Sequence, residues 1–369
     1  MKPFVPEKLP IKEVRWEPLI PLIGQANSSL ARYDGVLFAV PNPSVLLSPL
    51  TTQEAVLSSR IEGTLATLGE VLRHEAGEQV TDESKRLDIQ EIINYRRALQ
   101  TAEDDLKTRP FRLNLLLELH RILLEGVRGR DKARGSFRTT QNWIGAPRST
   151  VDQAQFVPPE PGLVPECLAD WEKYYHIEQP DPLVQLAIIH AQFEIIHPFL
   201  DGNGRLGRML VPLFLHEKRI LSRPMFYISS YLEEHRDEYV ESLRLLTVPG
   251  NWNRWIEFFL TSLTEQALAN ASKAREIISL YEDLKERVLD HTHSQYAVPL
   301  LDLLFGTPIF RSSSLVGRPG MPSKPMIMAM LGKLKAAGIL TVLREGSGRR
   351  AQVLALAELV NLCEEREVV

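Results

Sequence analysis

One apolar helix with clear start and stop signals, followed at once by a glycine-rich turn, constrains this chain more than any other feature. Asp181 is a favourable N-cap and Pro182 suits the first turn, so we predict a helix over residues 182–196. Pro198 disfavours helical backbone at the residue before it, which predicts that this helix ends at His197. The turn then leads into a second predicted helix, whose apolar stripe contains Leu206, Leu210, Leu213 and Phe214.

Helical periodicity runs through most of the remaining sequence up to about residue 289. Thr51 and Glu54 match a capping box, and Gly63 is a favourable residue to end the helix that this box would start. The further helices that we predict lie at about 52–62, 84–107, 112–125 and 164–176. Residues 137–157 lack this period and alternate apolar residues with turn residues, which favours a β-hairpin flap. The predicted fold class is therefore mainly α.

The pattern changes again after about residue 290. Ser323 can cap a helix that Gly338 closes, and two short apolar runs with a glycine-containing turn between them follow. This order is the outline of a winged helix. A length of 369 residues suits two or three domains. We predict an N-terminal helical region at 1–110, a central helical core at 111–289 and a winged-helix-like domain at 290–369.

Charge is distributed unevenly along the chain. Residues 306–357 contain eight Lys or Arg and one Glu, which gives this segment a net charge of +7. Because the whole chain has a net charge of −4, the remaining residues carry −11. A basic module raises the question of nucleic acid, although a solvated basic face is an equally ordinary interpretation. The helix near Met328 and Lys333 presents no Arg, Asn or Gln for bidentate contacts to bases. We favour a protein-docking or homodimer-supporting role, with DNA contact through phosphates as the alternative.

Cysteine content and hydropathy exclude several classes of protein. The two cysteines, Cys167 and Cys363, are too few and too far apart for a disulfide framework or a cysteine zinc site. No run approaches the ~18 apolar residues of a membrane span, and the N-terminus lacks the apolar segment of a signal peptide. We predict a soluble, cytoplasmic protein with no membrane contact.

The turn after the apolar helix carries the residues that chemistry on phosphates requires. It reads His197-Pro198-Phe199-Leu200-Asp201-Gly202-Asn203-Gly204-Arg205-Leu206-Gly207-Arg208. Asn203 is a predicted N-cap, so the backbone N–H groups of Gly204 and Arg205 should point out of a helix N-terminus, where the dipole favours anions. Glycines at 202 and 204 let a phosphate approach the backbone closely.

The charged side chains of this turn extend the same interpretation. Arg205 and Arg208 are three residues apart and share one helix face, which suits successive phosphates. Asp201 offers a hard oxygen ligand for Mg²⁺, and His197 is the nearby group that can accept a proton near neutral pH. The combination predicts a site for nucleotidyl or phosphoryl transfer.

Two other interpretations of the turn are weaker. Gly202-x-Gly204-x-x-Gly207 matches the dinucleotide fingerprint, but residues 221–227 hold no acidic partner for a ribose and the preceding segment is a predicted helix. A purely structural glycine turn leaves the clustered arginines and aspartate without a role.

The turn resembles the signature of the Fic family, His-Pro-Phe-x-(Asp/Glu)-Gly-Asn-Gly-Arg-x-x-Arg, at all nine specified positions. The resemblance extends to Phe193-Glu194, to 141–145 and 156–159 in the flap, and to 252–260, and it covers roughly residues 35–265. It implies a mainly helical fold and an adenylyltransferase that moves AMP from ATP onto a Ser, Thr or Tyr hydroxyl of a protein, itself included. Some family members transfer other groups, so the nucleotide is inferred from the resemblance. The alternative function is a DNA-binding transcriptional regulator that uses the Fic core as a nucleotide sensor or effector.

The resemblance also implies roles for individual residues. His197 would deprotonate the target hydroxyl, Asp201 would hold Mg²⁺, and the 137–157 flap would hold the target segment by strand addition. His235 would border the adenine, although the family often has Asn at that position. The nucleotide-binding residues implied are Gly202, Asn203, Gly204, Arg205, Leu206, Gly207, Arg208 and His235.

A second motif precedes the core. Ser58 and Glu62 are four residues apart on one helix face, and a carboxylate in the last turn of a helix is poorly placed without a cation. The pattern resembles the family's inhibition motif, (Ser/Thr)-x-x-x-Glu-(Gly/Asn), and implies that Glu62 pairs with Arg208 and blocks the γ-phosphate. The alternative is an exposed glutamate beside Arg60.

Overall fold

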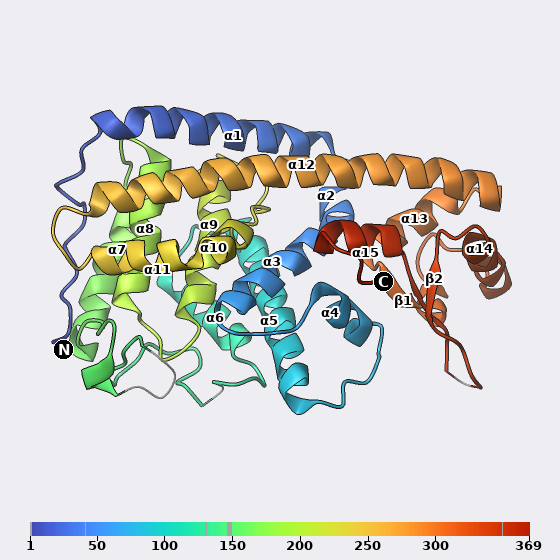
Figure 1. Cartoon of the computed structure of the whole chain (residues 1–369), viewed down its shortest axis with the longest axis horizontal. Helices are drawn as coiled ribbons and strands as arrows, with labels where there is room; N and C mark the ends of the chain where they lie inside the picture. Colours follow the sequence, from blue (N-terminus) through green and yellow to red (C-terminus); the bar gives the residue numbers. More distant parts are fainter. Residues whose placement is uncertain (1, 41, 130, 146–149, 349) are drawn as a thin grey trace. The chain divides into compact units, whose positions relative to one another are not determined.

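Helices make up most of the chain in the computed structural model, which describes residues 2–40, 42–129, 131–145, 150–348 and 350–369 (Figure 1). The α-helices are α1 (Ile20–Ala39), α2 (Pro43–Leu46), α3 (Ser48–Ile61), α4 (Leu68–Glu75), α5 (Glu83–Leu106), α6 (Leu113–Leu123), α7 (Val164–His176), α8 (Pro182–Ile196), α9 (Asn203–Glu217), α10 (Ser229–Glu234), α11 (Arg236–Leu245), α12 (Trp252–Thr292), α13 (Ala297–Gly306), α14 (Lys324–Ala336) and α15 (Ala357–Glu364). The strands are β1 (Ile309–Arg311), β2 (Thr341–Arg344) and β3 (Val353–Ala355), and the short 3-10 turns are η1 (Glu17–Leu19), η2 (Val151–Gln153), η3 (Pro161–Leu163) and η4 (Ser312–Leu315). No helix among the described residues is long and apolar enough to cross a membrane.

The chain divides into two compact units. Unit 1 comprises residues 1–34, 57–63 and 94–269, and unit 2 comprises residues 35–56, 64–93 and 270–369. The division falls inside four helices, α1, α3, α5 and α12.

Helix α8 is the centre of unit 1. It packs against α7 and α9, and thirteen of its fifteen residues are buried, as expected for a helix that is apolar on every face. Two buried tryptophans fix its position, because the indole N–H of Trp171 donates to the Ile189 carbonyl at 2.9 Å and that of Trp255 donates to the Ala187 carbonyl at 2.8 Å. These contacts fix the position of α8 and therefore of His197, the residue that follows its last turn.

Unit 2 contains the sheet. Its strand order is β1-β3-β2, both pairs are antiparallel, and α4 packs against β1. The predicted helix after Ser323 and the two strands that follow are present as α14, β2 and β3, but β1 was not predicted. Ser323 is the N-cap residue of α14 without a capping bond from its side chain.

The predicted start of α3 is wrong. The helix begins at Ser48, with Pro49 in its first turn, so Thr51 and Glu54 lie inside the helix and form no capping box. The end is as predicted, since the helix stops at Ile61 and Gly63 has the left-handed φ of +98°. A capping box does occur further on, where Thr67 caps α4 and exchanges hydrogen bonds with Glu70.

The 137–157 flap is less regular than the predicted β-hairpin. Within its described residues the only ladder contact is a single bridge between Ile144 and Phe156, and a 3-10 turn at Val151–Gln153 replaces a continued strand. Residues 146–149 of the predicted flap lie outside the described residues. Pro158 and Pro159 end the pairing because neither has a backbone N–H to donate.

Replacing Asp181 by Ala should destabilise the protein through the N-terminus of α8. The Asp181 carboxylate accepts hydrogen bonds from the N–H groups of Leu183 and Val184, both at 2.9 Å. Their loss should cost about 1 kcal/mol and lower the Tm by about 2–4 °C in thermal unfolding followed by circular dichroism. The control is Glu178→Ala. Glu178 lies exposed in the same segment between α7 and α8, and within the described residues only its backbone carbonyl accepts a hydrogen bond, so the Tm should stay nearly unchanged. Equal shifts for the two variants would contradict the capping role.

Candidate active site

The end of α8 presents His197 to the turn. His197 has the left-handed backbone φ of +48°, and its N–H still donates to the Phe193 carbonyl at 3.0 Å. This conformation is rare for a residue with a side chain and needs support from its surroundings. Arg138, 2% exposed, gives that support by donating to the carbonyls of His197 at 2.9 Å and Pro159 at 2.6 Å. Sequence reasoning missed Arg138, whose partners are backbone carbonyls from two distant segments.

The imidazole of His197 is set up to accept a proton. Its Nδ1 lies 3.2 Å from the carbonyl of Glu194, so Nδ1 carries the hydrogen in this pairing and Nε2 is left with the lone pair. Burial lowers the pKa of His197 to about 4, against smaller upward effects of the Glu194 carbonyl and the Glu62 charge. The ring is therefore neutral at physiological pH, the state that a general base requires.

The turn into α9 differs from the prediction at its cap. Gly202, with φ of +80°, occupies the N-cap position, and no side chain from the described residues caps the helix there. Asn203 is instead the first helical residue, and its amide closes the turn through two 2.9 Å bonds, one from the Phe199 N–H and one to the Phe199 carbonyl. The shift of one residue keeps the N-terminus of α9 free of a side-chain cap, where its dipole favours an anion.

Arg208 is the most buried charge of the turn. Its side chain is 1% exposed, and its Nε donates to Ser58 Oγ at 2.9 Å while Nη2 donates to the Ser58 carbonyl at 2.8 Å. The same Nη2 donates to Glu62 Oε1 at 2.7 Å, which is the ion pair that the resemblance implied. Burial raises the pKa of Glu62, but the charge and hydrogen bond of Arg208 outweigh that effect, so the pKa is lowered and the carboxylate is ionised.

The Glu62 carboxylate lies against the first turn of α9. A Cβ built on Gly204 would stand 2.3 Å from Glu62 Oε1 and 2.9 Å from Arg208 Nη1, so any larger residue at 204 would displace one of them. The carboxylate thus occupies the place where a helix N-terminus and a buried arginine would bind a phosphate. Its side chain is 41% exposed, so it reaches this place from the solvent side.

Arg205 and Asp201 form the other charged pair of the turn. Arg205 is 3% exposed and its Nη2 lies 3.3 Å from Asp201 Oδ1. The Asp201 side chain is 40% exposed, and a Cβ on Gly129 would come within 2.5 Å of its Oδ2, so this glycine leaves room for the carboxylate. No group of three His, Cys, Asp or Glu that could hold a metal occurs in the part of the chain that the structure describes. A single accessible carboxylate still fits Mg²⁺, which takes one or two carboxylates together with phosphate oxygens.

Two buried histidines, His120 and His190, form hydrogen bonds with backbone carbonyls of the turn. His120 Nδ1 accepts the Gly135 N–H at 2.9 Å and its Nε2 lies 3.1 Å from the Asp201 carbonyl, which assigns the hydrogen to Nε2. His190 Nδ1 lies 3.0 Å from the Gly207 carbonyl, and burial lowers the pKa of this imidazole to about 3. Both rings are neutral and orient main-chain atoms of the motif.

Glu194 is a second carboxyl group at the site. Its Oε1 is buried without a hydrogen-bond partner among the described residues, and a Cβ on Gly207 would lie 2.1 Å from this atom. Gly207 is therefore required by the approach of Glu194. Burial raises the pKa of Glu194 to about 8, against a downward effect of Arg208, so the group is mostly protonated at neutral pH. No local pattern predicted this protonation, because it depends on burial between helices α8 and α9.

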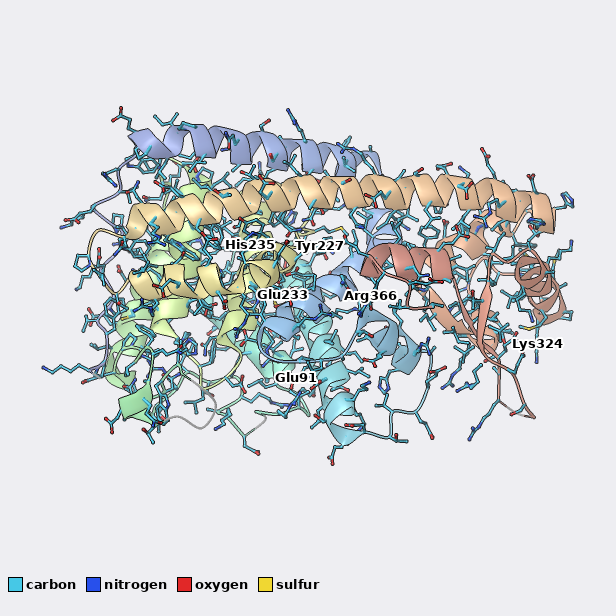
Figure 2. All side chains as sticks on the ribbon, viewed as in Figure 1. Glu91, Tyr227, Glu233, His235, Lys324 and Arg366 are labelled. Carbon is cyan, nitrogen blue, oxygen red and sulfur yellow. The ribbon has the colours of Figure 1, made fainter. Side chains whose placement is uncertain are left out.

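The remaining predicted residues lie around this centre. Leu206 is 1% exposed and packs in the core, so only its backbone can face the turn. His235, labelled in Figure 2, lies at the junction of α10 and α11, stacks on Tyr231 with ring centroids 4.0 Å apart, and has Nδ1 3.0 Å from the Tyr231 carbonyl. The structure therefore brings Ser58, Glu62, Gly204 and Arg208 into contact, whereas His235 pairs within its own helix.

Two sequence-family models match this chain. The Fic/DOC family N-terminal model matches residues 20–104 and the Fic/DOC family model matches residues 110–215, together more than half of the 369 residues. The chain belongs to the Fic family.

Relatives within the Fic family are similar over different shares of their length. A probable protein adenylyltransferase of Aquifex aeolicus is 25% identical over 309 residues, which are 79% of this chain and 83% of that protein. The protein adenylyltransferase of Caenorhabditis briggsae is 31% identical over 192 residues, which are 50% of this chain and only 34% of that protein.

Solved structures have the same fold as this Fic protein. A Fic family protein from Desulfovibrio desulfuricans superposes with a TM-score of 0.57 at 20% identity, over 95% of this chain and 98% of that one. A Fic-1 fragment from Caenorhabditis elegans gives a TM-score of 0.55 at 22% identity, over 71% and 75% of the two chains. At these identities the likeness shows the mainly helical Fic fold.

Glu194→Gln should change the pH dependence of stability. Between about pH 5 and 8 the Glu194 carboxyl is protonated in the folded protein and ionised in the unfolded chain, because burial raises its pKa from 4.5 to about 8. The wild type therefore loses stability at this residue as pH rises, whereas glutamine does not titrate. We expect the Tm difference between variant and wild type to grow in the variant's favour up to about pH 8 and then level off. Glu178→Gln, at an exposed position, should run parallel to the wild type, and a constant difference for Glu194→Gln would contradict the assignment.

Proposed function

We propose that this Fic protein is an autoinhibited protein adenylyltransferase. It transfers AMP from ATP to a Ser, Thr or Tyr hydroxyl of a protein, its own chain included, and releases pyrophosphate. The observation that carries the proposal is the occupation of the α9 N-terminus by Glu62, ion-paired at 2.7 Å with a buried arginine, beside a neutral histidine. Names of relatives support the same activity, since those from Aquifex aeolicus and Caenorhabditis briggsae are called protein adenylyltransferases.

The residues of the turn divide the chemistry among them. His197 Nε2 removes the proton from the acceptor hydroxyl, whose oxygen then forms a bond to the α-phosphorus as the bond to the β-phosphate oxygen breaks. The N-terminal backbone of α9 and the guanidiniums of Arg205 and Arg208 bind the phosphates and balance the charge that moves to pyrophosphate. Arg138 is a positioning residue, because it fixes the His197 carbonyl and touches no substrate atom.

Asp201 would hold Mg²⁺ in this site. The ion, when bound, neutralises phosphate charge and orients the α- and β-phosphates. Asp201 is suited to the role because its carboxylate is partly exposed, and because Arg205 at 3.3 Å is a partner that a phosphate can replace.

Autoinhibition follows from competition for Arg208. Its Nη2 donates to both Ser58 and Glu62, which leaves it committed while the carboxylate stays in place. Glu62 also repels an incoming phosphate, because both are negatively charged. The exposed Glu62 can leave to solvent, whereas the buried Arg208 cannot, so release requires movement at the end of α3.

The target protein is held by the flap. The single bridge between Ile144 and Phe156 leaves an irregular pair of segments to which an extended target segment can add. Asn142 ties this flap to the active-site turn, since its side-chain amide donates to the Phe199 carbonyl at 2.9 Å. The winged-helix interpretation, the homodimer, DNA contact and the cytoplasmic location stay predictions from the sequence, and Mg²⁺ binding is part of the present proposal.

Glu62→Gly should raise self-labelling, and His197→Ala should abolish it. The first change frees Arg208 and the α9 N-terminus for ATP, and the second removes the proton acceptor. We expect at least a tenfold rise and a loss of about 100-fold or more, respectively, in AMP incorporation from labelled ATP.

Two further variants make this test specific. Glu62→Gln removes the charge and keeps the shape, so it should also activate. Arg60→Ala alters the neighbouring cation and should label like the wild type. Equal labelling by the wild type, Glu62→Gly and His197→Ala would reject the site assignment.

Asp201→Asn, combined with Glu62→Gly, should raise the magnesium requirement. The amide keeps the size of the side chain but loses the charge that Mg²⁺ prefers. We expect the Mg²⁺ concentration for half-maximal labelling to rise by about tenfold or more. The matched control, Asp152→Asn in the Glu62→Gly background, alters a carboxylate of the flap and should leave the requirement unchanged. An unshifted magnesium curve for Asp201→Asn would remove Asp201 from the metal site.

A further inference from the structure

Unit 2 contains a cavity of about 370 Å³ that has no part in the active site. Three segments form it: the turn after α4 with Gly77 and Gln79, the end of β1 with Arg311, and the ribbon of β2 and β3 with Arg344 and Arg350. The volume lies within the ~300–1,000 Å³ range of sites for small ligands. Its lining contains three arginines and, among the described residues, no carboxylate.

Arg311 is held rigidly at the edge of this cavity. Its Nε donates to the Ala76 carbonyl at 2.5 Å and its Nη2 to the Gly77 carbonyl at 3.0 Å, both at the end of α4. A Cβ on Gly77 would stand 1.3 Å from Nη2, and Gly77 has φ of +81°, so only glycine allows this approach. These two bonds leave Nη1 and the second hydrogen of Nη2 as donors for a ligand.

Among the described residues, no hydrogen-bond or ion-pair partner is found for the side chains of Arg344 and Arg350. Arg344 Nε is buried without a hydrogen bond, and neither side chain forms an ion pair within the described residues. Other arginines of the same unit are paired, for example Arg287 with Glu358 at 2.9 Å and Arg366 with Glu364 at 3.0 Å. A buried donor without an acceptor calls for an explanation, and an anionic ligand supplies one.

The chemistry of the lining points to phosphate. One guanidinium group can donate two parallel hydrogen bonds to the oxygens of one phosphate. Three guanidinium groups around one cavity therefore match a ligand with two or three linked phosphates. The Ser313 hydroxyl adds a neutral donor. Duplex DNA fits less well, because it needs an extended surface, and the exposed face of α14 includes Ala329 and Gly332, which have no side-chain donor or acceptor for a base edge.

We propose that this cavity is a binding site for a small polyphosphate-bearing molecule. The ligand would connect the turn after α4 to the β2–β3 ribbon and stabilise unit 2 by binding its folded form. The site is separate from the proposed adenylyltransferase centre, so a failure here leaves the AMP-labelling result untouched.

Calorimetry on the full-length protein with inorganic tripolyphosphate tests the proposal. Arg344→Gln combined with Arg350→Gln should weaken binding by about tenfold or more, since two of the three guanidiniums are lost. The matched control is Arg318→Gln combined with Lys324→Gln, which removes the same charge from the same module outside the cavity (Lys324 is labelled in Figure 2). The control should bind like the wild type.

Three outcomes would overturn the site. One is the absence of binding by the wild type, and another is equal binding by both double variants, which assigns the heat to the active-site turn or to net charge. The third is a wild type that binds short duplex DNA but no tripolyphosphate, together with a loss of DNA binding in Arg344→Gln/Arg350→Gln. That result would make the cavity lining a nucleic-acid surface. Arg350→Glu, at an exposed position, guards against misfolding and should also weaken binding while its circular dichroism matches the wild type.

Discussion

The buried guanidinium of Arg208 is the constraint on which the active site depends. A cation that is 1% exposed must be paired, because desolvation without a counter-charge costs several kcal/mol. Ser58 supplies two neutral acceptors, and Glu62 supplies the charge. In the proposed mechanism a phosphate replaces Glu62, because the two negative groups would compete for one place beside Arg208. Inhibition and nucleotide binding would then be alternative ways of pairing the same arginine, and the balance between them would depend on what stabilises the last turn of α3.

The second carboxyl near Arg208 matters because it is neutral. Burial raises the pKa of Glu194 to about 8, whereas Glu62, nearer to the arginine and to solvent, stays ionised. If Glu194 were also ionised, Arg208 would be compensated without Glu62, and an incoming phosphate would meet a buried negative charge. A protonated Glu194 keeps the cation available for one exchangeable anion. The close approach of Glu194 to Gly207 thus contributes to the charge balance of the site as well as to packing.

Local signals in the sequence predicted the frame of this site, but not its supports. The bounds of α8 followed from Asp181 and Pro198, which act on their immediate neighbours. The contact of Glu62 with Arg208, 146 residues apart, came from a family resemblance because no local pattern encodes it. Arg138 was missed because its partners are backbone carbonyls of remote segments, and His190 because it bridges the Gly207 carbonyl and the Tyr239 hydroxyl, which only the folded chain brings together. The start of α3 was misplaced because Thr51 and Glu54 match a capping box, whereas the helix already begins at Ser48 with Pro49 in its first turn.

Arg138 and Arg311 show why the same residue type serves different ends. Both are fixed by backbone carbonyls, which positions a guanidinium without neutralising its charge. Arg138 uses four of its five N–H groups on the carbonyls of Thr140, Pro159, Ile196 and His197, and it is only 2% exposed, so a ligand has little access to it. Arg311 donates to two carbonyls and borders a cavity beside Arg344 and Arg350, for which the described part of the chain provides no partner. The first arrangement uses most of the donors to hold the left-handed turn at His197, whereas the second leaves donors facing a cavity of ligand size. We therefore propose a binding role for Arg311 and only a positioning role for Arg138.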